Sequence, residues 1–144
     1  MTLQLHLNPN DSPRRRTILL VEDEPFVREV TRNILQRAGF EVLTAADTRD
    51  ALQVYAGCNR KIDLVMTDMV LPGGTGHQLG LDLRQFSPQL AILMTSGYPN
   101  PENLDALDRR AFFLAKPYSR LTLIAKIETI LDSDPTRSPT VQAS

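Results

Sequence analysis

The chain has 144 residues, of which 42% are hydrophobic and 23% charged, a composition typical of one globular domain rather than a disordered chain. Its 16 Lys and Arg residues against 17 Asp and Glu leave a net charge of -1, which argues against a basic nucleic-acid-binding surface. The single cysteine, Cys58, cannot form an internal disulfide, and no apolar run approaches the roughly 20 residues of a membrane helix. We therefore expect a cytoplasmic protein with no membrane and no direct nucleic-acid partner.

Polar segments with two prolines each stand at both ends of the chain, at residues 1–16 and 133–144. Such segments bury too little apolar surface to offset the entropy lost on ordering. We expect flexible tails at both ends and a folded domain over residues 17–132.

Short apolar runs alternate with helical patterns between the tails. The first run, TILLV at 17–21, has the continuous aliphatic character of a strand buried on both faces. In the helix predicted after it, Pro25 suits the first turn, Gly39 follows the end, and Phe26 and Val30 recur at four-residue spacing. Further strands are predicted at 41–45, 62–67, 90–95 and 112–115, and further helices at 48–56, 76–86, near 102–109 and at about 119–132. Five strand–helix units in succession predict an α/β fold with a parallel sheet and helices on both of its faces.

Charged and hydroxyl side chains follow four of the predicted strands. Ligands of parallel α/β sheets bind outside the carboxyl ends of the strands, where these residues are expected to meet: Glu22, Asp23, Glu24, Asp68, Thr95, Ser96 and Lys116. Taken singly, each has an ordinary explanation in helix ends or turns. Taken together, crowded carboxylates repel one another, and a divalent cation such as Mg²⁺ with oxygen ligands reconciles them. The pattern therefore predicts a site built for a phosphoryl group.

An aspartate carboxylate can act as a nucleophile and form an aspartyl phosphate. If Glu22 and Asp23 hold the metal, Asp68 is left as the acceptor. Mg²⁺ and Lys116 would then stabilise the phosphoryl oxygens, and Ser96 could donate a hydrogen bond to the product.

Four motifs, VEDE (21–24), TDMVLPGGTG (67–76), TSGY (95–98) and AKPY (115–118), closely resemble the receiver domain of two-component and phosphorelay response regulators. Their order and spacing match that family across essentially the whole predicted core. The segments LPGGTG (71–76) and TSGY (95–98) look most like receivers of hybrid kinases and of stand-alone regulators. The resemblance implies a flavodoxin-like (βα)5 fold whose five-stranded parallel sheet has the order 2-1-3-4-5.

The resemblance also implies a role for each matching position. Asp68 would accept a phosphoryl group from a phosphohistidine on a sensor histidine kinase or a histidine phosphotransfer protein. Asp23 would bind Mg²⁺ directly, Glu22 mainly through water, and Asp68 and the backbone carbonyl of Val70 would complete the protein ligands. Lys116 would pair with the phosphoryl group, and its bond to the next residue, a proline, is usually cis in the family.

A switch is implied as well. Ser96 matches the switch hydroxyl because a small residue, Gly97, follows it, and Thr95 is the rival assignment. Phe113 occupies the position of the switch aromatic and would turn inward when Ser96 is drawn to the phosphoryl group. The proline-rich segment 99–111 departs from the pattern and predicts a short, poorly defined fourth helix.

We therefore expect a stand-alone receiver that takes a phosphoryl group on Asp68 in a Mg²⁺-dependent reaction and switches its contacts with an unidentified target protein. It would not be an enzyme in the usual sense, but a phosphoacceptor that promotes its own phosphorylation and slow autodephosphorylation. A phosphatase of the haloacid dehalogenase type needs a second Asp two residues after the nucleophile, where this chain has Val70. The alternative is an interaction scaffold with the receiver fold that takes no phosphate.

Overall fold

The computed structural model describes residues 15–58, 61–97 and 110–133. Its strands are β1 (Thr17–Val21), β2 (Glu41–Ala45), β3 (Leu64–Asp68), β4 (Val70–Leu71), β5 (Gly74–Thr75), β6 (Ala91–Ser96) and β7 (Ala111–Ala115). Its helices are α1 (Pro25–Arg37), α2 (Thr48–Gly57), α3 (Gly76–Arg84) and α4 (Arg120–Asp132). Apart from β4 and β5, these elements lie within about two residues of the predicted ones, and the helix expected near 102–109 lies outside the described residues. No helix of the described residues is long and apolar enough to cross a membrane.

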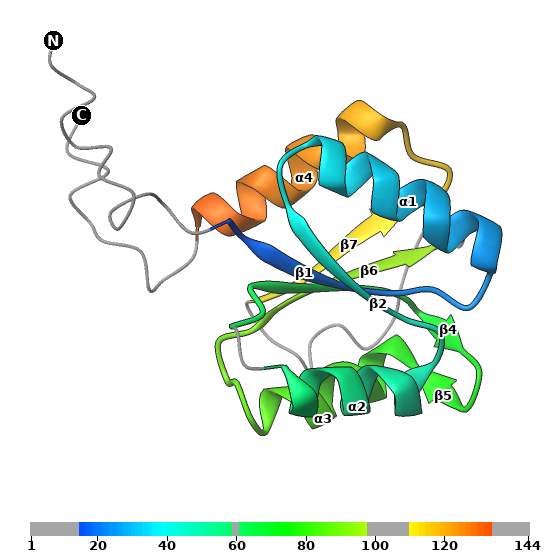
Figure 1. The fold of residues 1–144 in the computed structure, drawn as a ribbon, viewed down its shortest axis with the longest axis vertical. Coiled ribbons are helices and arrows are strands. Elements are labelled where there is room, and N and C mark those ends of the chain that lie inside the picture. The colour runs from blue at the N-terminus through cyan, green and yellow to red at the C-terminus, as the bar shows by residue number, and fades with distance from the viewer. Residues whose placement is uncertain (1–14, 59–60, 98–109, 134–144) are drawn as a thin grey trace, which may run out of the picture.

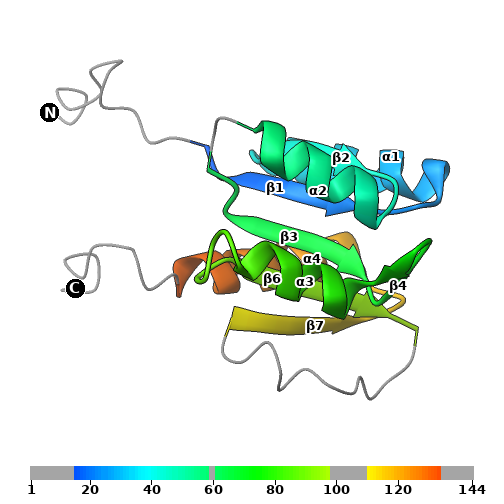
Figure 2. The same ribbon diagram turned by 90° about the horizontal axis from the view of Figure 1, so that it is seen from below.

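Five of the strands form one parallel sheet in the order β2-β1-β3-β6-β7 (Figures 1 and 2). Counting only these five strands along the chain, the order is 2-1-3-4-5, which confirms the predicted flavodoxin-like topology. The two short strands β4 and β5 pair antiparallel in a separate hairpin. The sequence analysis predicts no strand in this segment, because two-residue strands around Gly73, whose φ is +82°, leave no periodic signal.

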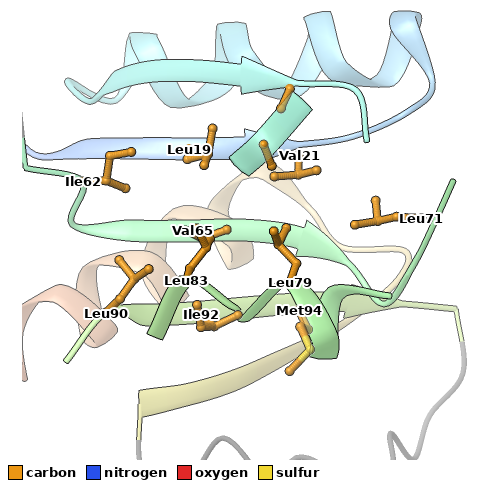
Figure 3. Close-up of a cluster of buried hydrophobic side chains, with 12 residues drawn as sticks. Leu19, Val21, Ile62, Val65, Leu71, Leu79, Leu83, Leu90, Ile92 and Met94 are labelled. Carbon is orange, nitrogen blue, oxygen red and sulfur yellow. The ribbon is translucent and has the colours of Figure 1, made fainter. Parts of the chain in front are cut away.

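Two hydrophobic cores flank the sheet, and the alternation of side chains along each strand divides the residues between them. Helices α2 and α3 cover one face, and α1 and α4 cover the other (Figure 1). Figure 3 shows the core under α2 and α3, where Leu19, Val65 and Ile92 from three strands meet Leu79 and Leu83 of α3. The central strands β1, β3 and β6 are buried on both faces, as their continuous apolar runs predict, whereas the edge strands β2 and β7 are mostly half-buried.

Helix α1 turns a different side to the sheet than its apolar spacing suggests. Leu35 and Thr31 are its buried residues, whereas Phe26 is 75% exposed and Val30 is 41% exposed. The apolar residues at the start of α1 are therefore on the surface, beside the carboxyl end of the sheet.

Side-chain caps fix where three helices begin after their strands. The side chains of Asp47, Thr75 and Ser119 accept hydrogen bonds from backbone N–H groups three residues ahead, at the starts of α2, α3 and α4. Such caps satisfy N–H groups that have no partner within the helix. They hold the helix starts close to the carboxyl edge of the sheet, where the predicted site residues lie.

Candidate functional site

Three carboxylates meet where the neighbouring strands β1 and β3 end. Glu22 follows β1, with its backbone N–H bonded to the carbonyl of Ala45 at 3.0 Å, and Asp68 is the last residue of β3. Ligand oxygens of Glu22, Asp23 and Asp68 all lie within 4.8 Å of one another. Glu22 is 7% exposed and the Asp68 side chain 13% exposed, whereas Asp23 faces solvent. The group therefore combines two buried carboxylates with one that water can reach.

The Asp68 carboxylate is held from the other side by β6 and the end of β7. Its Oδ1 lies 2.7 Å from Nζ of Lys116 and accepts a hydrogen bond from Oγ1 of Thr95 at 2.9 Å. The backbone N–H of Lys116 donates to the carbonyl of Ser96 at 2.8 Å, which anchors the lysine at the strand ends. The Lys116–Pro117 peptide bond is cis.

These groups line an open hollow of about 190 Å³. Its walls are formed by Asp68, Met69, Val70, Thr95, Ser96, Gly97 and Lys116. Both Asp68 and Lys116 line the hollow, so a small anionic group that enters it would meet the positive charge of Lys116 beside the Asp68 carboxylate.

The site perturbs the titration of its own groups. Burial, together with the nearby charge of Asp68, raises the pKa of Glu22 to about 7, against a hydrogen bond from the backbone of Glu24 and the attraction of Lys116, which both lower it. Burial alone would lower the pKa of Lys116, but its hydrogen bond to Asp68 and the charges of Asp68 and Glu22 raise it above its ordinary value. Lys116 therefore stays charged, but its positive charge is not enough to keep the pKa of Glu22 at its ordinary value.

This donor set fits a hard divalent cation. The close carboxylates supply oxygen ligands, which Mg²⁺ prefers, and the exposed side of Asp23 leaves room for the water molecules that Mg²⁺ keeps. Asp23, Glu22 and Asp68 would hold the ion. Burial, and to a smaller extent the charge of Asp68, raise the pKa of Glu22, so a positive charge bound beside Glu22 would favour its ionised form.

The structure brings most of the predicted site residues together. Glu22, Asp23, Asp68, Ser96 and Lys116 lie as the strand-end argument predicts, and Ser96, which is 9% exposed, is the last residue of β6. Val70 begins β4 and lines the hollow, and its carbonyl as a metal ligand stays a prediction. Phe113 is half-buried in β7 opposite Met94, and its switching also stays a prediction.

The structure adds one contact to the sequence prediction, which placed Thr95 among the strand-end residues and considered it as a rival for the switch position. The structure pairs Thr95 with Asp68 across β6 and β3, and its hydroxyl touches the carboxylate itself. The register of two parallel strands decides this contact, and a sequence alone does not contain that register to the residue.

Comparison with known proteins agrees with the fold and the site. The family model "Response regulator receiver domain" matches residues 18–128. The chain therefore belongs to the receiver domain family of response regulators. Receiver domains are signalling proteins that bind Mg²⁺ at an acidic cluster and interact with histidine kinases or phosphotransfer proteins.

Two curated relatives illustrate the range of proteins that carry this domain. The sensor kinase CckA of Brucella abortus is 34% identical over 119 residues, which are 81% of this chain and 12% of CckA. The phosphate regulon transcriptional regulatory protein PhoB of Pseudomonas aeruginosa is 32% identical over 120 residues, 81% of this chain and 52% of PhoB. The chain thus spans about half of one relative and an eighth of the other.

Solved receiver domains match most of this chain and are themselves matched over almost their whole length. The receiver domain of the hybrid histidine kinase CckA superposes with a TM-score of 0.70 at 33% identity, covering 80% of this chain and 98% of that one. The response regulator TrrA of Thermotoga maritima, solved in complex with Mg²⁺–BeF, gives a TM-score of 0.70 at 27% identity, covering 80% and 98%.

Proposed function

We propose that this receiver domain accepts a phosphoryl group on Asp68 in a Mg²⁺-dependent reaction, and that the modification changes its contacts with other proteins. The observation that carries the proposal is the position of the Asp68 carboxylate. It lies between the acidic residues Glu22 and Asp23 on one side and the Lys116 ammonium, at 2.7 Å, on the other.

The proposed transfer needs little chemistry from the protein besides position and charge. A carboxylate oxygen of Asp68 forms a bond to phosphorus while the bond from phosphorus to the donor nitrogen or oxygen breaks, and the donor leaves with that electron pair. Lys116 leaves the carboxylate and pairs with the phosphoryl oxygens, and Ser96 lines the hollow from the side. Bound Mg²⁺ would supply positive charge that stabilises those oxygens.

The phosphodonor is proposed to be a histidine kinase or a histidine phosphotransfer protein, as for relatives such as the sensor kinase CckA. Exposed apolar side chains near the hollow support a protein donor. Phe26 is the second residue of α1, Leu121 is the second residue of α4, and Val70 is the first residue of β4. Their exposed fractions are 75%, 78% and 73%. All three elements begin at the carboxyl edge of the sheet (Figure 1), so a protein that brings phosphohistidine to Asp68 would cover these side chains.

Intact mass after incubation with acetyl phosphate and Mg²⁺ tests the proposal. The wild-type protein should gain one phosphoryl group, and the gain should disappear with EDTA and in Asp68→Asn. Asp82→Asn, which changes a carboxylate on α3 away from the hollow, is the matched control and should still be phosphorylated. Wild-type protein that neither gains mass nor binds Mg²⁺ would favour the interaction scaffold instead.

A further inference from the structure

The hydroxyl of Thr95 is aimed at the carboxylate of the proposed phosphoacceptor. Thr95 is 2% exposed, it lies opposite Asp68 in the register of β6 and β3, and its Oγ1 donates to Asp68 Oδ1 at 2.9 Å. Its carbonyl also accepts the N–H of Met69 at 3.0 Å, which ties the end of β3 to Thr95. Building on the proposed phosphorylation of Asp68, we infer that the Thr95 hydroxyl accelerates the loss of the phosphoryl group from phospho-Asp68.

The two oxygens of Asp68 are not equivalent. Oδ1 is held by both Thr95 and Lys116, so Oδ2 is the oxygen that attacks phosphorus, and Oδ1 becomes the carbonyl oxygen of the acyl phosphate. The long side chain of Lys116 can swing toward the phosphoryl oxygens. Thr95 is fixed by strand pairing and by the stiffness of a β-branched side chain, so its hydroxyl stays on Oδ1.

Hydrolysis returns negative charge to that oxygen. The oxygen of a water molecule forms a bond to phosphorus, the bond from phosphorus to Oδ2 breaks with its electron pair remaining on the carboxylate, and the water proton passes to solvent. The products are inorganic phosphate and the Asp68 carboxylate, whose charge is shared between Oδ1 and Oδ2. A hydrogen bond to an ionised acceptor is roughly twice as strong as one to a neutral acceptor.

The Thr95 hydrogen bond therefore strengthens as the phosphoryl group leaves. The transition state of phosphoryl transfer is loose in most analyses, so the departing carboxylate already carries much of its charge there. Thr95 lowers the free energy of the transition state and of the product relative to the acyl phosphate. Formation of the acyl phosphate is affected less when a small donor such as acetyl phosphate is used, because bond formation to Asp68 is only slight in a loose transition state.

Thr95→Val tests the inference because it removes the hydroxyl and keeps the branched shape. The expected result is a half-life of phospho-Asp68 longer by about fivefold, with an initial rate of phosphorylation by acetyl phosphate within about twofold of wild type. Thr95→Ser, which keeps the donor, should restore the wild-type half-life. Thr67→Val is the matched control, since the Thr67 hydroxyl donates to the backbone carbonyl of Asp68 at 3.0 Å and not to the carboxylate.

The outcomes separate this inference from the proposed function. If wild-type protein neither gains a phosphoryl group nor binds Mg²⁺, the proposed function fails, and the inference about Thr95 fails with it. If wild-type protein is phosphorylated, two results for Thr95→Val would contradict the role assigned to Thr95. The variant could lose the phosphoryl group at the wild-type rate, or its phosphorylation and its dephosphorylation could both be slower by the same factor. Circular dichroism monitors folding, and Thr95→Ala removes the same hydroxyl should the valine variant not fold.

Discussion

The first residue of α3, Gly76, packs directly against the backbone of Asp68. A Cβ at Gly76 would overlap the carbonyl oxygen of Asp68 and would also touch the side chain of Thr67 at 3.0 Å. The N–H of Gly76 donates to the carbonyl of Met69 at 2.9 Å. The backbone that carries the Asp68 carboxylate is thus fixed by a helix start that has no room for a side chain.

Gly76→Ala should therefore displace Asp68 as well as strain α3. We expect a loss of about 1–3 kcal/mol in the free energy of unfolding and slower phosphorylation in the molecules that remain folded. Urea denaturation and intact mass measure the two effects. Gly57→Ala is the control, because a Cβ at Gly57 meets nothing within 4 Å; an equal loss in both variants would contradict the close packing at Gly76.

Lys116 is expected to matter for the reaction more than for the fold. Lys116→Met keeps the apolar stem and removes the ammonium that contacts Asp68. Phosphorylation by acetyl phosphate should slow on the order of a hundredfold, which is typical for loss of a group that stabilises transition-state charge. Lys126→Met, in α4, should phosphorylate at the wild-type rate. A wild-type rate in Lys116→Met would remove the lysine from the mechanism.

Glu22 should make the metal-free protein less stable as the pH rises. Its pKa is raised from 4.5 to about 7 in the folded protein, so between these values the folded state binds more protons than the unfolded state, and stability falls with increasing pH. The penalty is absent below pH 4.5 and complete above about pH 7. In EDTA, Glu22→Gln should therefore exceed the wild type in Tm at pH 8 and match it near pH 4. A difference that does not change with pH would contradict this assignment.

Binding of Mg²⁺ should remove that penalty and stabilise the folded state. At a hundredfold excess over Kd, a ligand that binds only the folded protein contributes about 2.7 kcal/mol, which corresponds to a rise in Tm of about 10 °C for a domain of this size. Differential scanning fluorimetry with Mg²⁺ and then EDTA measures the rise and its reversal. Asp23→Asn should shift much less, and an equal shift would place the ion elsewhere.

Phe26 should contribute to contact with a protein phosphodonor and not to the chemistry. Phe26→Ser is expected to slow phosphotransfer from an autophosphorylated histidine kinase that loads the wild type, with no change in phosphorylation by acetyl phosphate. Phe86→Ser is the control, since Phe86 is 73% exposed but follows α3 at the opposite end of the sheet. A loss of transfer in both variants would show that Phe26 has no special part in the contact.

The resemblance to receiver domains implied the sheet order. The meeting of Glu22, Asp68 and Lys116 was predicted from the residues alone, because parallel strands bring their carboxyl ends to one edge whatever the loops between them do. Sequence reasoning did not predict which side of α1 is buried. Apolar residues four apart drift around a helix of 3.6 residues per turn, so Phe26 and Leu35 cannot both face the sheet, and only packing decides between them. The contact of Thr95 with Asp68 depends in the same way on strand register.

Glu22, Asp68 and Lys116 lie at the ends of β1, β3 and β7, which are far apart in the sequence. The contacts of Asp68 with Lys116 and Thr95, and its approach to Glu22, can form only after these strands have joined the sheet. A chain that has folded only in part therefore lacks the proposed phosphorylation site, and we expect only molecules with a complete sheet to be phosphorylated.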